Sequence, residues 1–429
     1  MDEFVIEGGA VLSGVVTPSG NKNAAFPLIA AALLTDQPVV LRNLPDIEDV
    51  RTMLQIVEGL GVGVIRQDSH TITIRAREIS TDTPDSRMLR RIRGALVLIG
   101  PLLARRGSVR VGRFGGDQIG RRRIDTHVTG LQELGVKAEH GADLVLTTGG
   151  LCGQDLLLEE ASVTATENIV LAAVQARGTT IIRNAASEPH VQQLCELLNA
   201  MGARIAGVAS NTLIIEGVSA LRGADFTLGP DFMEVGSLIA LGAIAGENVV
   251  IKNAGPEHMR MTLKVFGRLG VRVNVAGADL VVPGGDELRV AQDIGGAIPS
   301  IDDGPWPAFP ADLMSAALVA ATQAHGTVLF HEKMYESRLF FVDRLIGMGA
   351  RIVLCDPHRA LVSGPSRLRG EADGIASPDI RAGVALLMAA LCAEGKTVIR
   401  SVHQIDRGYE RFEEKLAGLG ARIKRVSAA

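Results

Sequence analysis

One pattern of apolar and polar positions recurs along the chain. Each copy has a helix with one apolar face, the tripeptide Leu/Met-Gly-Val/Ala, and a strand in which apolar and polar residues alternate. The tripeptide glycines are Gly61, Gly135, Gly202, Gly270, Gly349 and Gly420. A helix ends most easily on a residue that tolerates the left-handed backbone conformation, as glycine does. We therefore expect each glycine to end a helix just before a strand.

A second pattern accompanies each copy. It is an alanine-rich helix, a turn and a β-branched strand, as in QPVVLRN at 37–43 and GTTIIRN at 178–184. Units of about 70 residues with helices and several short strands can bury their helices against their own sheet, so they predict α+β subdomains and not a solenoid. Six units divide into two groups of three with a cleft between them. The alternative is chance similarity among helix ends, which six matched pairs in order argue against.

Composition narrows the class of protein. At 429 residues the chain is too long for one core, and its net charge of −4 gives no global sign of nucleic acid or a membrane surface. The four cysteines are far apart and form no CxxC, which indicates a reducing compartment without a disulfide framework or metal site. The acidic N-terminus has no apolar core of a signal peptide. The uncharged run at 313–330 contains Ser, Thr, Gln and His, so we expect a buried helix and strand there.

Positive charge is concentrated in one stretch. From Arg87 to Arg123 there are eleven arginines and a single acid, Asp117. Guanidinium groups suit phosphate and carboxylate ligands, so the cluster predicts an anionic ligand. A solvated basic face is the alternative for any one of these arginines.

Four further stretches place charged residues at turns or helix starts. Lys22 and Asn23 open a helix, where a lysine can hold a phosphate or simply lie on the surface. Asp312 follows two prolines, and Asp379 with Arg381 opens another helix; each acid could instead be an N-cap or first-turn residue. IDRGYER at 405–411 packs four charges into seven residues, which a solvated turn would also explain.

These stretches together resemble the enolpyruvyl transferase (EPSP synthase) family, over about residues 5–426. The similarity rests on KNAA at 22–25, the glycine loop GGDQIG at 115–120, PAFPAD at 307–312, the Asp379-x-Arg381 pair and IDRGYER. It is closest to the branch that uses UDP-N-acetylglucosamine, because the shikimate branch has a serine-rich GSKS where this chain has GNKN.

The resemblance implies an α+β fold: a two-domain inside-out α/β barrel, each domain with three βαβαββ-type units, and a cleft that closes over substrates. Residues 1–21 and 231–429 would form the catalytic domain, on the phosphoenolpyruvate and base side. Residues 22–230 would form the other domain, with a mobile loop at 112–123 and the nucleotide contacts. The N-terminal strand would complete the C-terminal domain.

The resemblance also implies a reaction. The 3′-hydroxyl of UDP-N-acetylglucosamine adds to C2 of phosphoenolpyruvate, C3 is protonated, and phosphate leaves; this is the first committed step of peptidoglycan synthesis. No metal or organic cofactor is implied, nor a nucleic-acid or membrane partner, and we expect a cytoplasmic monomer. The catalytic residues implied are Lys22, Asp117, Asp312 and Arg407. The substrate-binding residues implied are Asn23, Arg93, Arg122, Arg123, Ile124, Asp125, Ser162, Val163, Thr164, Arg338, Asp379 and Arg381.

By this similarity, Lys22, Arg122 and Arg407 hold the phosphate of phosphoenolpyruvate. Arg338 and Arg381 face its carboxylate. Asp312 orients the attacking hydroxyl and takes its proton. Asn23 contacts the sugar. Arg93 and 162–164 lie near the diphosphate, and 122–125 near the uridine.

Asp117 stands where the family usually has a cysteine thought to protonate C3. An unperturbed Asp is protonated in only about one molecule in a thousand at pH 7, and neighbouring arginines lower that fraction. Asp117 can therefore act as the acid only if loop closure buries it while substrate anions neutralise the arginines. The alternative is that Asp117 pairs with Arg121 or Arg122 and shapes the loop. With no thiol at this position, resistance to fosfomycin is expected.

Four other positions depart from the family pattern. Thr164 replaces glycine, Asn21 alanine, Phe232 arginine and Arg123 proline. They leave open a paralogue that acts on another uridine nucleotide or nucleotide sugar. A non-catalytic anion or nucleic-acid binder is the third hypothesis, disfavoured because the charged motifs spread along the whole chain are retained and aromatic stacking platforms are few.

Overall fold

The structure is a computed structural model that describes residues 2–117 and 119–427. The chain forms two compact units. Unit 1 contains the N-terminal residues up to Ser19, the short segment Asp117–Arg121, and Pro230 onward. Unit 2 contains Gly20–Gly116 and Arg122–Gly229.

These bounds differ slightly from the predicted domains. Gly20 and Asn21 group with unit 2, and Pro230 with unit 1. The expected loop 112–123 is divided, because Asp117–Arg121 groups with unit 1 and the rest with unit 2. Gln118, inside this loop, lies outside the described residues. The two crossing segments pair: the Gly229 carbonyl accepts from the Asn21 N–H at 2.9 Å, and the Ser19 carbonyl from the Asp231 N–H at 2.8 Å.

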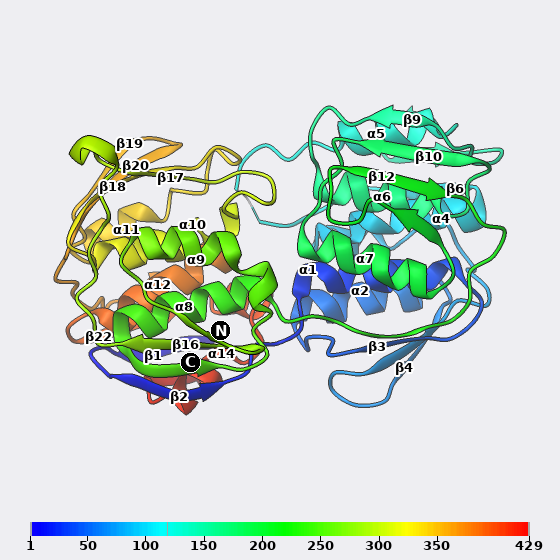
Figure 1. Cartoon of the computed structure of the whole chain (residues 1–429). Coiled ribbons are helices and arrows are strands. Elements are labelled where there is room, and N and C mark those ends of the chain that lie inside the picture. Colours follow the sequence, from blue (N-terminus) through cyan, green and yellow to red (C-terminus); the bar gives the residue numbers. More distant parts are fainter. Residues whose placement is uncertain (1, 118, 428–429) are drawn as a thin grey trace. The chain divides into compact units, whose positions relative to one another are not determined.

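Unit 2 alternates helices with short strands (Figure 1). Its helical segments are α1 (Lys22–Ala31), η1 (Ala32–Leu34), α2 (Glu48–Gly59), α3 (Ser86–Leu89), η2 (Gly94–Leu98), α4 (Ile99–Arg106), α5 (Asp125–Glu133), α6 (Val163–Ala173) and α7 (Pro189–Ala200). Its strands are β3 (Val39–Arg42), β4 (Gly63–Arg66), β5 (Ile72–Arg75), β6 (Ser108–Val111), β7 (Lys137–His140), β8 (Leu144–Thr147), β9 (Asp155–Leu157), β10 (Thr179–Arg183), β11 (Arg204–Ala206), β12 (Thr212–Glu216) and β13 (Asp225–Thr227). They form the sheets β13-β3-β5-β4, β6-β8-β7 and β11-β12-β10-β9.

Unit 1 repeats the plan. Its helical segments are α8 (Phe232–Ala245), η3 (Pro256–His258), α9 (Arg260–Arg268), η4 (Ile294–Gly296), α10 (Ala311–Thr322), α11 (Val342–Gly347), α12 (Ile380–Cys392), α13 (His403–Asp406) and α14 (Phe412–Gly418). Its strands are β1 (Asp2–Glu7), β2 (Leu12–Val16), β14 (Gly246–Ile251), β15 (Asn274–Ala276), β16 (Asp279–Gly284), β17 (Ser300–Asp302), β18 (Gly326–His331), β19 (Ile352–Asp356), β20 (Arg359–Gly364), β21 (Ile375–Ala376), β22 (Lys396–Arg400) and β23 (Arg422–Ser427). They form the sheets β15-β16-β14-β2, β17-β18-β20-β19 and β21-β22-β1-β23.

The predicted βαβαββ unit is present in both units. The order β9-α6-β10-α7-β11-β12 is one copy, and β17-α10-β18-α11-β19-β20 is another. In each, the first strand pairs parallel with the second, and the remaining pairs are antiparallel. The uncharged run at 313–330 lies on α10 and β18, as expected.

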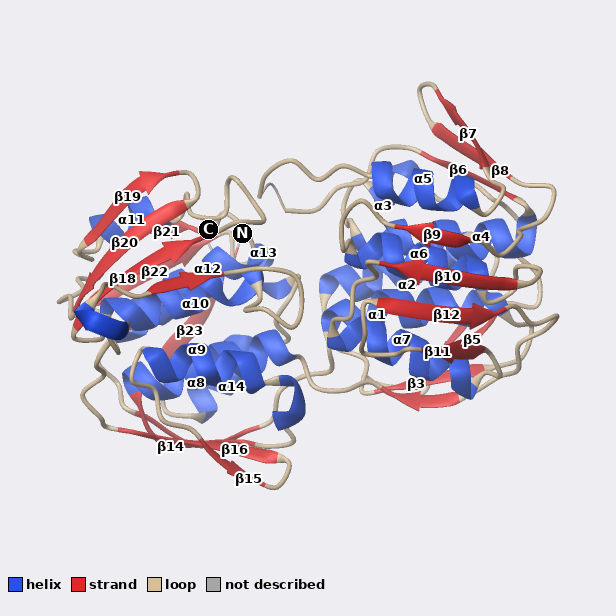
Figure 2. Ribbon diagram, turned by 45° about the horizontal axis from the view of Figure 1, so that its top comes forward, coloured by secondary structure: helices blue, strands red, loops and turns tan. Residues whose placement is uncertain are grey.

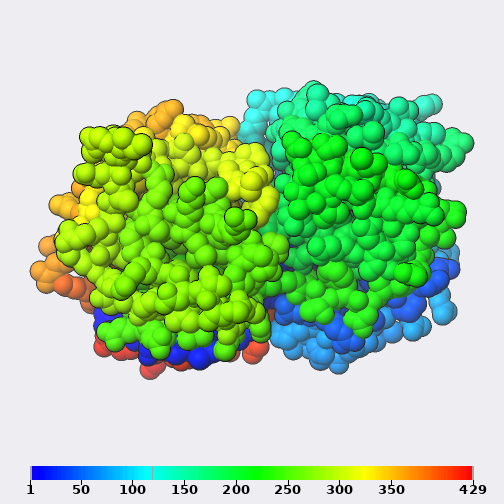
Figure 3. Space-filling model, in the orientation of Figure 1, coloured from blue at the N-terminus to red at the C-terminus, as the bar shows by residue number. Residues whose placement is uncertain are grey.

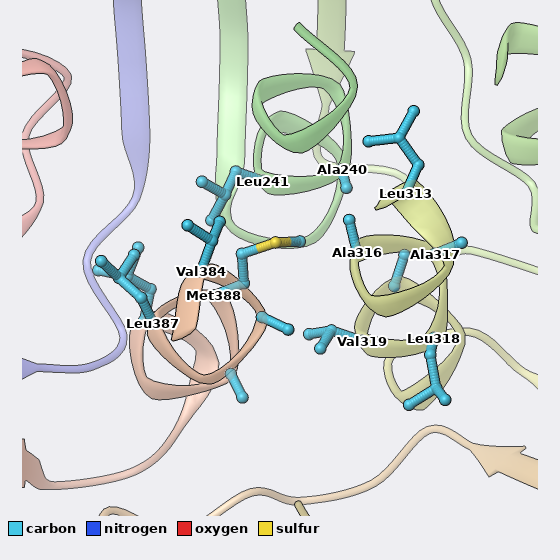
Figure 4. Close-up of a cluster of buried hydrophobic side chains, with 14 of the residues drawn as sticks. Ala240, Leu241, Leu313, Ala316, Ala317, Leu318, Val319, Val384, Leu387 and Met388 are labelled. Carbon is cyan, nitrogen blue, oxygen red and sulfur yellow. The ribbon is translucent and has the colours of Figure 1, made fainter. Parts of the chain in front are cut away.

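Each unit has its helices inside and its sheets outside, which confirms the inside-out arrangement (Figure 2). In unit 1, nearly every residue of α8, α10 and α12 is buried. Their apolar side chains, such as Ala240, Ala316, Val384 and Met388, meet in one core (Figure 4). Helices α1, α6 and α7 contribute to a similar core in unit 2. Such helices lack a polar face because sheets and other helices surround them.

The N-terminal strands complete unit 1, as predicted. Strand β1 lies between β22 and β23, with Phe4 opposite Ile399 and Arg425. Strand β2 pairs parallel with β14. Figure 3 shows the N-terminal residues, in blue, beside the C-terminal ones, in red, on the surface of this unit. The last repeat therefore takes a strand from the opposite end of the chain.

The repeat glycines behave as predicted. Each follows a helix and precedes a strand, with φ between 87° at Gly270 and 101° at Gly349. Because this backbone region is strained for residues with a Cβ atom, the glycine fixes where each helix ends. The pattern was readable from the sequence because it depends only on local backbone geometry.

Candidate active site

A carboxylate held between two arginines is the centre of the unit 1 cluster. Asp312 lies in the first turn of α10, and its two oxygens bind different guanidinium groups. Arg338 Nη2 bonds Oδ1, and Arg381 Nε donates to Oδ2 at 2.9 Å. The arginine side chains are 4% and 5% exposed, whereas that of Asp312 is 28% exposed. The structure thus brings together three predicted site residues that are 69 positions apart at most.

The same two arginines keep unused donors. Arg338 Nε and Nη1 and Arg381 Nη1 are buried without a hydrogen-bond partner in the described part of the chain. Burial disfavours the charged form of both guanidinium groups, but nearby acids hold their pKa values above the usual range. Buried donors without acceptors are costly, so this arrangement suits an anionic ligand that would supply the acceptors.

Helix α12 and an aromatic ring fix the position of Arg381. Asp379 caps this helix, and its Oδ1 accepts from the N–H groups of Arg381 and Ala382 at 2.8 and 2.9 Å. Burial raises the pKa of Asp379, against the lowering effect of Arg338. The Arg381 guanidinium lies over the Tyr409 ring, 5.3 Å from its centroid. The N-cap alternative for Asp379 is therefore correct in geometry, and its contact with substrate remains a prediction.

Asp117 makes an ion pair that the sequence did not suggest. Its Oδ1 accepts from Arg407 Nη1 at 2.7 Å, and both side chains are mostly buried. Arg407 Nη1 also donates to Gln404 at 2.9 Å. The alternative that we considered named Arg121 or Arg122 as the partner, whereas the ion pair seen for Asp117 is with Arg407. Near the same segment, the Arg121 N–H donates to the Glu336 carboxylate at 3.0 Å.

Two buried acids lie beneath the segment that carries Arg338. Asp303 and Glu332 are 3% and 0% exposed. Asp303 Oδ1 accepts from the Lys333 N–H at 2.5 Å, and Glu332 Oε1 from the Tyr335 N–H at 3.2 Å. Their other oxygens have no donor among the described residues. Burial and Asp303 raise the pKa of Glu332 to about 9, so Glu332 keeps its proton at neutral pH.

In unit 2, Lys22 is the first residue of α1 and is only 7% exposed, so the surface-lysine alternative is wrong. Its Nζ lies 2.9 Å from Oδ2 of Asp49, a buried acid in the first turn of α2 that the sequence reasoning missed. Asn21 caps α1, and its Oδ1 accepts from the N–H groups of Asn23 and Ala24 at 2.9 and 3.2 Å. The departure from alanine at position 21 therefore has a local role in holding the helix start.

The arginine cluster has mixed roles. Arg87 and Arg91 pair with Asp85 and Glu48 at 2.9 and 2.6 Å on the surface. Arg105 donates to carbonyl groups. The interpretation of the whole cluster as one anion site is therefore wrong for these members. Within and next to this cluster, the residues predicted to bind substrate are Arg93 and the segment 122–125.

At that segment, Arg93 Nη2 donates to the Arg123 carbonyl at 3.1 Å. Arg123 forms an exposed ion pair with Asp125, the first residue of α5. Arg93 and Ile124 also line a cavity of about 390 Å³ with Arg113, Phe114, His140 and Asp143. The structure thus places two predicted nucleotide residues, Arg93 and Ile124, at one opening.

The expected diphosphate segment is the start of α6. Ser162 is its N-cap residue, followed by Val163 and Thr164. The Thr164 hydroxyl lies 3.1 Å from Nε2 of His127. His127 is a buried residue of α5 that no sequence motif pointed to.

Phe232 departs from the family's arginine and lies in the core. It is 3% exposed in α8, with its ring edge-on to Trp306 at 6.2 Å. Asp231 caps the same helix, accepting from the N–H groups of Met233 and Glu234 at 2.9 and 3.2 Å. The side chain at 232 therefore contributes packing in this chain.

In residues 2–117 and 119–427, no group of three or more His, Cys, Asp and Glu side chains is arranged to hold a metal ion. Over the same ranges, every helix is too short or too polar to cross a membrane.

Comparison with known proteins shows the family to which the chain belongs. The profile of EPSP synthase (3-phosphoshikimate 1-carboxyvinyltransferase) matches residues 6–416. UDP-N-acetylglucosamine 1-carboxyvinyltransferase of Bradyrhizobium diazoefficiens is 52% identical, over 99% of this chain and 98% of that protein. The protein of the same name from Borreliella burgdorferi is 51% identical over 100% of both chains.

Solved structures of enolpyruvyl transferases have the same fold. The enolpyruvyl transferase NikO from Streptomyces tendae superposes with a TM-score of 0.88 and 25% identity, over 100% of this chain and 99% of that one. EPSP synthase from Acinetobacter baumannii, at 18% identity and a TM-score of 0.76 over 100% of both chains, shares the fold. The chain belongs to the EPSP synthase family of enolpyruvyl transferases.

Proposed function

We propose that this protein transfers the enolpyruvyl group of phosphoenolpyruvate to the 3′-hydroxyl of UDP-N-acetylglucosamine and releases phosphate. The observation that carries the proposal is the carboxylate of Asp312 between Arg338 and Arg381, each of which keeps at least one buried N–H donor without a partner among the described residues. It combines a base with an anion receptor. Relatives about half identical over their whole length bear the name of this activity, which supports the choice of acceptor.

The roles in unit 1 follow from charge and geometry. Arg338 and Arg381 bind the carboxylate of phosphoenolpyruvate through their unused N–H groups. Asp312 is partly exposed, so it can accept a hydrogen bond from the acceptor's hydroxyl and take its proton as the O3′–C2 bond forms. Asp379 holds the backbone at Arg381 and thus positions that arginine.

Arg407 and Asp117 form the second pair in this unit. We assign the phosphate of phosphoenolpyruvate to Arg407, where it competes with the Asp117 carboxylate. A carboxylate displaced from its guanidinium partner binds a proton more readily. Asp117 can then protonate C3, and the later loss of a C3 proton with the phosphate group restores the double bond. No metal or organic cofactor enters this scheme.

In unit 2, Lys22 and Arg122 are the proposed cationic ligands of substrate phosphate groups. Asn23 contacts the sugar, and the start of α6 at 162–164, with Arg93, receives the diphosphate. Segment 122–125 lies at the uridine. We place the reaction in the cytoplasm, where it would start peptidoglycan synthesis, with a single chain as the working unit.

A second acceptor is the alternative. Thr164 and Arg123 differ from the glycine and proline that the family pattern has on the nucleotide side. These two differences are the reason to test a paralogue that uses another uridine nucleotide or nucleotide sugar.

Phosphate release from phosphoenolpyruvate, measured in parallel with UDP-N-acetylglucosamine, UDP-glucose and UMP, separates the two. The proposal expects the highest kcat/KM with UDP-N-acetylglucosamine. An advantage of at least tenfold for either other acceptor would replace it with the paralogue. Release with none of them would contradict both.

A further inference from the structure

Three side chains of unit 2 form a hydrogen-bonded chain that ends at the expected diphosphate segment. Asn168 on α6 contacts His127 on α5, with 3.1 Å between Nδ2 and Nδ1. His127 contacts Thr164, one turn before Asn168 on α6, with 3.1 Å between Nε2 and Oγ1. Asn168 and His127 are 0% and 2% exposed, and Thr164 is partly exposed. The chain thus runs from the core towards the surface.

The backbone fixes the orientation of the Asn168 amide. The Gly100 N–H, which can only donate, lies 2.8 Å from Oδ1. The Leu96 carbonyl, which can only accept, lies 2.9 Å from Nδ2. The second Nδ2 hydrogen is directed at His127. Nδ1 of His127 must therefore be the acceptor and carry no proton.

His127 is consequently a neutral ring with its proton on Nε2. Burial, with a smaller contribution from Arg93, lowers the pKa of His127 to about 3. The Nε2–H group then donates to the Thr164 hydroxyl oxygen. Because that oxygen already accepts from the ring, the hydroxyl's own proton turns away from His127. Among residues 2–117 and 119–427, this hydroxyl has His127 as its hydrogen-bonded side-chain partner.

We infer that Thr164 is an oriented hydrogen-bond donor to a phosphate oxygen of the nucleotide-sugar substrate, and that His127 and Asn168 are its positioning residues. The inference rests on the proposed function, which supplies the diphosphate. A donor kept in one orientation loses less entropy when it binds than a freely rotating hydroxyl. A glycine at 164 would leave the His127 Nε2–H without this acceptor and the phosphate without this donor.

The surroundings favour an anion over a neutral group. The positive charge of Arg93 is close enough to affect the titration of His127. Thr164 is the second residue of α6, where backbone N–H groups have no partner within the helix. His127 itself is too buried, and too fully bonded at both nitrogens, to contact the substrate.

The test compares Thr164→Val, which removes the hydroxyl but keeps the shape, with Thr164→Ser, which keeps the hydroxyl. Thr179→Val, at an exposed position of β10, is the control. A hydrogen bond to a charged group corresponds to about 10- to 100-fold in affinity. We expect Thr164→Val to raise KM for UDP-N-acetylglucosamine by that factor with KM for phosphoenolpyruvate unchanged. Thr164→Ser should raise it far less than Thr164→Val does, and Thr179→Val should match the parent.

Two further measurements test the positioning role. Nitrogen-15 NMR of histidine-labelled protein should show His127 with its proton on Nε2 and no titration from pH 5 to 9. His127→Leu should raise KM for the nucleotide sugar in the parent but add nothing in the Thr164→Val background.

Equal KM for the nucleotide sugar in the parent and both Thr164 variants would overturn the inference while the proposed function stands. A proton on Nδ1, or a His127 that titrates in this range, would overturn it as well. Absence of turnover with UDP-N-acetylglucosamine in the parent would instead contradict the proposed function, on which the inference rests.

Discussion

Replacing Asp312 with Asn tests the centre of the unit 1 cluster. The substitution keeps the side-chain shape but removes the negative charge between Arg338 and Arg381. An amide can offer its oxygen to only one arginine, and its NH2 group then faces donors of the other. Two buried guanidinium groups would lose their shared counter-ion.

Two effects of different size follow. Breaking a buried ion pair by removing one partner costs about 3–5 kcal/mol, and the partial exposure of Asp312 reduces this to about 2–3 kcal/mol. For a unit of this size, that corresponds to a fall in Tm of about 4–12 °C. Loss of a general base lowers turnover by about 10²- to 10⁴-fold. Turnover should therefore fall far more than instability explains at 25 °C.

The assay combines calorimetric unfolding with phosphate release at 25 °C. Asp286→Asn is the matched control, because Asp286 forms an exposed ion pair with Arg272 in the same unit. It should change stability by less than about 1 kcal/mol and leave turnover unchanged. Phosphoenolpyruvate should stabilise Asp312→Asn more than the parent, because its carboxylate replaces the missing charge.

Turnover of Asp312→Asn within threefold of the parent, together with the expected fall in Tm, would show that Asp312 only neutralises the two arginines. An unchanged Tm would refute the argument that their charges depend on it.

The remaining predictions concern stability and the loop. Glu332 contributes stability that is full below about pH 4.5, its ordinary pKa, and is lost as pH rises through about 9. Glu332→Gln should therefore raise Tm at pH 8 and flatten the pH dependence of Tm, whereas a lower Tm would contradict a protonated Glu332 in the folded state. Gly202 has a φ of 100° with open space around it, so Gly202→Ala should lower the free energy of unfolding by about 1–2 kcal/mol. Gly270→Ala should lower it more, because the new Cβ would lie 2.5 Å from the Arg289 backbone nitrogen. Equal unfolding free energies for the two variants would disprove this steric argument. The parent should resist fosfomycin, and Asp117→Cys should be alkylated at the new thiol, which mass spectrometry would detect. Fosfomycin adducts at another residue of the parent would contradict this prediction.

The sequence predicted what depends on short-range geometry. The repeat glycines, the strands that follow them and the helix starts at Lys22, Asp312 and Asp379 are local, and the structure confirms them. The family resemblance supplied the wider fold and the site residues. The assembly of Asp312 with Arg338 and Arg381 follows from the way the repeats of unit 1 pack.

Partners from distant segments could not be predicted. Asp49 near Lys22, Arg407 at Asp117 and Tyr409 beneath Arg381 are contacts that only the fold creates. His127 resembles any histidine in a helix, and only its bonds to Thr164 and Asn168 distinguish it. A cluster of arginines in sequence was a poor guide, because their helices and loops turn them towards different partners.

The most direct test of the proposed activity follows the carbon atoms. Phosphoenolpyruvate labelled with carbon-13 is incubated with the protein and UDP-N-acetylglucosamine, and the products are examined by NMR and mass spectrometry. The account predicts one phosphate released per enolpyruvyl group found as an enol ether on the 3′ oxygen of the sugar. Phosphate release with the label recovered as free pyruvate, or attached at any other position or on no nucleotide, would contradict it.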